Sequence, residues 1–169
     1  VNVNAMLKNV TILCIAAFRR HIEIVDLLLR KGADPNIRVF GNMNALSFAV
    51  ISQNIEIIKL LLSHNVEIFD SDHGGNTCLI KAVTDENKEI VDMLLKHGVN
   101  VNARNNRGAS AMHFAAAIGN IYLINTLLKY NGDVNIKNKK GGTPLHVAVL
   151  YERKKAIEFL IRNGADCRI

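Results

Sequence analysis

The chain has 169 residues and a net charge of +6 at pH 7, with a pI of about 9.4. Hydrophobic residues make up 49% of it and aromatic residues 5%, and there is no Trp. The longest apolar run, Val10–Phe18, falls well short of the ~20 residues of a membrane span, and the N-terminal stretch lacks a signal-peptide layout. The composition therefore disfavours a membrane-spanning protein and leaves a polyanionic partner open.

The chain is built from five copies of one 33-residue pattern. A residue type preferred at helix N-caps recurs at Thr11, Asn44, Thr77, Ser110 and Thr143. A large apolar residue follows two positions later at Leu13, Leu46, Leu79, Met112 and Leu145, and an alanine five positions later at Ala16, Ala49, Ala82, Ala115 and Ala148. Such self-similarity predicts a linear array of stacked units in place of one central core.

We place the repeats at residues 5–37, 38–70, 71–103, 104–136 and 137–169, after the tail of another repeat at residues 1–4. The whole of residues 1–169 is then a single array. The first and last repeats lack the polar outer face of a terminal repeat, which suggests an excerpt of a longer array.

Each repeat is expected to hold two short helices, and the spacing of apolar residues places them in chain order. The predicted helices are Ile22–Arg30, then Ala45–Ile51 and Ile55–Ser63, and in the fourth repeat Ser110–Ala117 and Ile121–Tyr130. The apolar run Val10–Phe18 is assigned to the first helix of the first repeat, with Thr11 as its cap. Phe69 occupies a column that holds Asn36, Asn102 and Asn135, whose amides can bond loop backbone. A looser joint, or local packing of Phe69, is expected there.

The stretch Gly142–Ala148, which reads G-T-P-L-H-V-A, resembles the ankyrin repeat, as do the paired leucines such as Leu94-Leu95 and the tail Asn163–Asp166. The resemblance covers nearly the whole chain. It implies an all-α ankyrin-repeat solenoid, in which stacked helix-turn-helix units carry projecting β-turn or loop fingers. It also implies that the chain binds other proteins.

The sequence offers little for catalysis or metal binding. Cys14 and Cys78 fall in helix columns and are expected to be buried, and three unpaired thiols suit a reducing, cytoplasmic compartment. The imidazoles of His113 and His146 are expected to bond loop backbone. No motif for a nucleophile, a metal or a phosphate loop is present, so we predict a non-enzyme without cofactor or metal.

By the resemblance, partners contact the fingers and the exposed side of each first helix. This rule selects Phe18, Arg19, Arg38, Phe40, Met43, Ile51, His73, Asn76, Thr84, Asp85, Arg104, Asn106, Arg107, Ile118, Lys137, Lys139, Lys140 and Tyr151. The strip is apolar near repeat two, acidic at repeat three and basic at repeats four and five, which is typical of a protein-binding surface. As an alternative, Phe40 and Met43 pack under their own finger and the lysines are merely solvated.

The interpretation is a monomeric, non-catalytic scaffold whose protein partner carries an acidic region opposite repeats four and five. One alternative is binding of nucleic acid or another polyanion through the basic fingers, which the scarcity of aromatic residues disfavours. Another is a structural or regulatory segment of a larger channel, toxin or effector protein.

Overall fold

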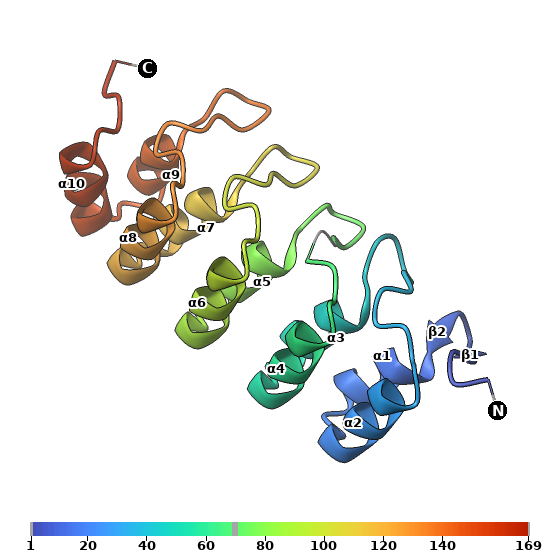
Figure 1. The fold of residues 1–169 in the computed structure, drawn as a ribbon. Helices are drawn as coiled ribbons and strands as arrows, with labels where there is room; N and C mark the ends of the chain where they lie inside the picture. Colours follow the sequence, from blue (N-terminus) through green and yellow to red (C-terminus); the bar gives the residue numbers. More distant parts are fainter. Residues whose placement is uncertain (1, 69–70, 169) are drawn as a thin grey trace. The chain divides into compact units, whose positions relative to one another are not determined.

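A computed structural model describes residues 2–68 and 71–168, and within these residues short helices alternate with turns and loops, and one pair of two-residue strands is present (Figure 1). Two compact units make up the chain, Val1–His73 and Gly74–Ile169. The N-terminal unit contains β1 (Met6–Leu7), β2 (Val10–Thr11), α1 (Ile12–Phe18), α2 (Ile22–Arg30), α3 (Ala45–Ile51) and α4 (Ile55–Ser63). The C-terminal unit contains α5 (Cys78–Thr84), α6 (Lys88–Lys96), α7 (Ala111–Ile118), α8 (Ile121–Lys129), α9 (Pro144–Leu150) and α10 (Lys154–Arg162).

The first helix of every repeat begins after the predicted cap residue. Thr11 Oγ1 accepts a hydrogen bond from the Cys14 amide, and Thr77 Oγ1 accepts one from the Ile80 amide. An extended cap residue with such an acceptor satisfies an amide that has no partner inside the helix. The cap column read from the sequence is therefore confirmed in all five repeats.

Three predicted helices, Ile22–Arg30, Ala45–Ile51 and Ile55–Ser63, have the observed bounds. In the first repeat, α1 begins at Ile12 after the predicted cap Thr11, but the assignment of Val10 to this helix is wrong. Val10 and Thr11 form β2, which pairs with β1 in an antiparallel hairpin.

In the fourth repeat the predicted helix Ser110–Ala117 is displaced by one residue to Ala111–Ile118. Ser110 has extended backbone angles and acts as the cap, and Gly119 ends the helix in the left-handed region. The predicted helix Ile121–Tyr130 ends at Lys129, and Tyr130 is its C-cap.

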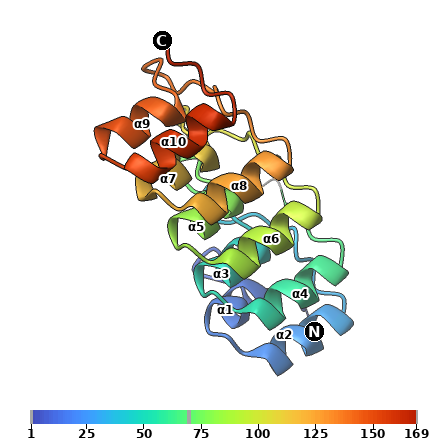
Figure 2. The same ribbon diagram turned by 90° about the vertical axis from the view of Figure 1, so that its left-hand side faces the viewer.

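Packing follows the repeat columns. Within the C-terminal unit, α7 contacts α5 and α9 while α8 contacts α6 and α10, so first helices and second helices form two rows (Figure 2). The alanine column is at most 4% exposed in every repeat, since these small side chains let neighbouring helices approach closely. Cys14 and Cys78 are buried, as predicted, and neither forms a disulfide within the described residues.

Asparagines in three repeat tails link their own tail to the next one within the same unit. Asn102 Nδ2 donates to the carbonyl of Asn131 over 3.1 Å, and the Asp133 amide donates to Asn102 Oδ1 over 2.8 Å. Asn36 and Asn135 make the equivalent pair of bonds within their own units. The expected role of this column is thereby confirmed for the three asparagines, whereas the prediction for Phe69 lies outside the described residues.

Candidate functional site

In the N-terminal unit, the predicted apolar side chains are largely accessible. Phe18 is 49% exposed and stacks edge to face on Phe48, with ring centroids 6.3 Å apart. Ile51 is 38% exposed and Phe40 is 47% exposed, so its own finger does not cover Phe40. Met43 is half-buried in a bridge to Val39.

The predicted polar residues of this unit differ in their surroundings. The Arg38 guanidinium lies 2.9 Å from the Glu67 carboxylate, so its charge is compensated locally. Arg19 and His73 are exposed, and His73 lies against the second finger, where its ring would be 3.3 Å from a Cβ added to Gly41.

In the C-terminal unit, several predicted contact residues are occupied by structural interactions. Asn76 Oδ1 accepts from Asn105 Nδ2 over 2.8 Å, and the Asp85 carboxylate pairs with Lys81 over 2.5 Å. Thr84 is exposed, but its hydroxyl donates to the Ile80 carbonyl. Ile118 is half-buried, and Tyr151 is 54% exposed. The negative charge that Asp85 brings to the predicted strip is thus compensated by Lys81.

The fingers of repeats four and five, residues 104–110 and 137–143, are two copies of one hairpin. Asn105 Oδ1 accepts from the amides of Arg107 and Ala109, and Asn138 Oδ1 accepts in the same way from Lys140 and Gly142. A side-chain acceptor that closes a turn on its own backbone fixes the turn locally. Each finger therefore presents cations at equivalent positions, Arg104 with Arg107 and Lys137 with Lys140.

The two fingers are joined by one backbone–backbone hydrogen bond and one side chain–backbone hydrogen bond. The Lys139 amide donates to the Arg107 carbonyl over 3.0 Å, and the Arg104 guanidinium donates to the Lys137 carbonyl over 3.3 Å. Gly108 makes this approach possible, because a Cβ there would stand 2.6 Å from the Lys139 nitrogen. Its φ of +76° also favours glycine.

Finger five is further anchored by a buried imidazole of the preceding repeat. His113 Nδ1 accepts from the Ser110 amide, which leaves Nε2 to donate to the Gly142 carbonyl over 3.0 Å. Burial lowers the pKa of His113 below its usual 6.5; the bond to Gly142 opposes this shift, and the positive charge of Arg104 adds to it. The predicted role of His113 is confirmed. His146, in the same column, bonds the backbone amide of its cap residue, Thr143.

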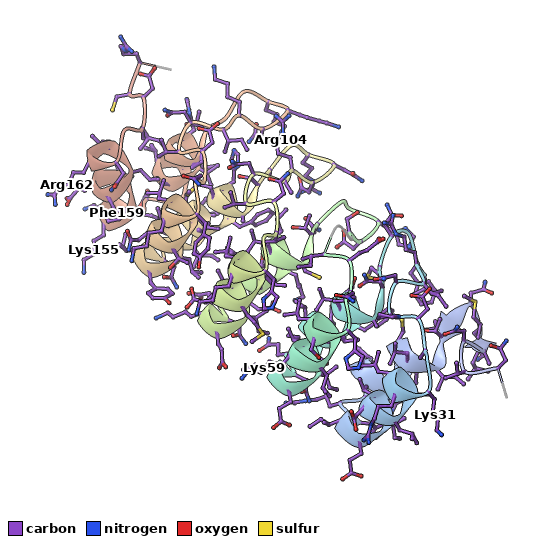
Figure 3. The ribbon with its side chains drawn as sticks, in the orientation of Figure 1. Lys31, Lys59, Arg104, Lys155, Phe159 and Arg162 are labelled. Carbon is purple, nitrogen blue, oxygen red and sulfur yellow. The ribbon has the colours of Figure 1, made fainter. Side chains whose placement is uncertain are left out.

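We call Arg104, Arg107, Lys137, Lys139 and Lys140 the basic fingers. All five are exposed, and Asn106 is exposed beside them. Within the described residues, no ion pair is formed by Arg107, Lys139 or Lys140. Figure 3 shows Arg104 on the finger side of the C-terminal unit, and Lys155 and Arg162 along α10.

Formal charge is unequally divided between the two units. Residues 1–73 contain seven Lys and Arg and seven Asp and Glu, whereas residues 74–169 contain fourteen and eight. The whole net charge of +6 therefore belongs to the C-terminal unit, which also carries the basic fingers.

Sequence reasoning missed two exposed apolar residues at the end of α9. Leu150 is 76% exposed and Val149 is 56% exposed. Leu150 lies in the same 33-residue column as Phe18 and Ile51, so the period itself was the signal that could have identified it.

Over residues 2–68 and 71–168, His, Cys, Asp and Glu side chains do not gather into a group of three that could hold a metal ion. In the same residues, every helix is too short or too polar to cross a membrane.

Fold and fingers together define a helical-repeat protein whose loops project from paired helices. A family model for ankyrin repeats matches residues 13–105 and 98–169, and the chain belongs to the ankyrin-repeat family. A search of curated proteins found no match to the chain. Ankyrin repeats are generally protein–protein interaction modules and are typically not catalytic.

Proposed function

We propose that the chain is a non-catalytic binding module that holds an acidic region of a protein partner on its basic fingers. The observation that carries the proposal is the pair of fingers with matching cations, fixed to one another by the bond from the Lys139 amide to the Arg107 carbonyl. Because the backbones of the two fingers are already joined, these loops need not be ordered when a partner binds, and less of the binding energy is lost to loop ordering. The exposed apolar residues Leu150 and Tyr151 of the same unit can supply further contact area.

The test is affinity capture from a nuclease-treated lysate with three baits. These are the unmodified chain, the double variant Arg107→Glu/Lys140→Glu, and the double variant Lys155→Glu/Arg162→Glu. Both variants lower the net charge equally within the C-terminal unit, but only the first alters the fingers. Helical circular dichroism of each bait checks that it is folded.

We expect a protein that the unmodified chain and the α10 variant both retain and that the finger variant loses. Equal retention by all three baits would remove the fingers from the site. Nucleic acid held in untreated lysate and released by salt, with no protein retained, would instead support binding of polyanions.

A further inference from the structure

Fingers four and five carry cations of the basic fingers at equivalent positions, one repeat apart. The distance between these positions limits the conformation of an acidic segment that can contact both loops. The two arms of finger four pair with each other through the Asn105 amide and the Ala109 carbonyl, and finger five pairs with finger four through Lys139 and Arg107. Paired backbones lie ~4.7–4.9 Å apart, and one repeat contains two such spacings. The backbone positions of equivalent cations, such as Arg107 and Lys140, are therefore about 10 Å apart by this spacing.

An acidic segment engages both fingers with the least rearrangement of the Arg and Lys side chains when its carboxylates recur on one side at about the same interval. In a β-strand, side chains on one face recur every ~6.6 Å or ~13 Å, and neither value matches. In a polyproline II segment, every third side chain points the same way at ~9.3 Å. An α-helix can offer positions seven apart at ~10.5 Å, but a short helix is marginal in water and must be ordered on binding.

We infer that the basic fingers bind an extended, polyproline II-like segment whose acidic residues stand three positions apart, one carboxylate to each finger. This inference rests on the proposed function and adds the conformation and the spacing of the bound segment. Because polyproline II is a major conformer of unfolded chains, a disordered acidic tail binds at a small ordering cost.

The test uses fluorescein-labelled peptides and the complete chain, with affinity measured by fluorescence polarisation. One peptide has glutamates three apart in a proline-rich frame, as in Glu-Pro-Pro-Glu. A second has the same composition with glutamates two apart, as in Glu-Pro-Glu-Pro. A third is an alanine-rich helical peptide with glutamates seven apart. Each is measured on the unmodified chain and on the variants K137A/K140A and K155A/R162A.

We expect the Glu-Pro-Pro-Glu peptide to bind about two- to fivefold more tightly than the second and third, as one additional exposed ion pair would give. The variant K137A/K140A lacks the two cations of finger five that are equivalent to Arg104 and Arg107. Residual binding to the remaining cations should persist, but without a preference for one glutamate spacing. The α10 variant should retain the preference.

Equal binding of the three peptides, with loss in K137A/K140A, would overturn the inferred spacing and leave the proposed function standing. Tightest binding of the helical peptide would overturn the inferred conformation alone. Binding of none would overturn the inference, and the affinity capture would then decide separately whether the fingers bind a protein.

Discussion

Gly108 shows how one residue controls the contact between two fingers. Its φ is +76°, and an added Cβ would meet the Lys139 backbone nitrogen at 2.6 Å. We expect Gly108→Ala to lower the free energy of unfolding by about 1–3 kcal/mol, since the left-handed conformation and a backbone clash both penalise a side chain. Chemical denaturation of the purified chain measures this loss.

Gly141 is the matched control, because it lies one period later with a φ of +78° and nothing within 4 Å of an added Cβ. Gly141→Ala should therefore show the conformational cost without the clash. Equal losses in the two variants would mean that the contact between fingers adds nothing to stability.

His113 makes stability depend on pH. Burial lowers its pKa in the folded chain, so in the unfolded chain the imidazole binds a proton at higher pH. The stability contributed by the neutral imidazole is complete above pH 6.5 and is lost as the pH falls below 6.5 toward the lowered pKa. Denaturation series between about pH 7.5 and pH 5 should show this decline.

Replacing His113 with Gln removes the group that titrates, and the decline below pH 6.5 should become shallower. His146→Gln is the control, because that imidazole is exposed and lies in the same column. If His113→Gln retains the full decline, another group is responsible for it.

At the scale of helices, the second helices differ in how they begin. Asn54, Asn87 and Asn120 cap α4, α6 and α8 with a side-chain hydrogen bond, whereas His21, in the same column, makes no such bond at the start of α2. We expect His21→Asn to raise the free energy of unfolding by about 1 kcal/mol, the usual contribution of an N-cap. Thermal and chemical denaturation both report it.

The reciprocal change, Asn87→His, should lower stability by a similar amount, because the Ile90 amide then loses its acceptor. A gain from His21→Asn without a loss from Asn87→His would contradict the role assigned to this cap column.

Local chemistry explains which features could be predicted from the sequence. The caps and the alanine column could be predicted because they recur at the 33-residue period. Each of these residue types also meets its structural requirement without a particular partner side chain. Val10 was misassigned because its apolar side chain suits a helix face, and only its pairing with Leu7 places it in β2. Likewise, the basic residues of the fingers could be identified directly in the sequence. The ion pairs of Arg38 with Glu67 and of Asp85 with Lys81 could not, because they depend on the positions of the side chains in the fold.

At the scale of the molecule, the unequal charge predicts a response to salt. Repeats four and five together, residues 104–169, contain eleven Lys and Arg and four Asp and Glu, so like charges repel within the C-terminal unit. We expect the free energy of unfolding to increase by a few tenths of a kcal/mol when NaCl is raised from about 0.05 M to 0.5 M, because the ions screen this repulsion. Denaturation midpoints at the two salt concentrations measure this salt-dependent stabilisation.

The stabilisation by salt should be smaller in the finger variant Arg107→Glu/Lys140→Glu than in the α10 variant Lys155→Glu/Arg162→Glu. The reason is that Arg107 and Lys140 belong to fingers that bond directly to one another. If both variants reduce the stabilisation equally, the total charge of the unit accounts for the effect and the arrangement of the fingers does not.

The bond from His113 to the Gly142 carbonyl joins a helix of repeat four to the finger of repeat five. A finger is therefore held partly by side chains that precede it by a whole repeat. Ile80 stands at the His113 position of repeat three, and finger four is instead anchored there by the bond between Asn76 and Asn105. Transplanting finger five into another array would accordingly require α7 to travel with it, so the exchangeable module of this chain begins two helices earlier than its sequence repeat, at α7.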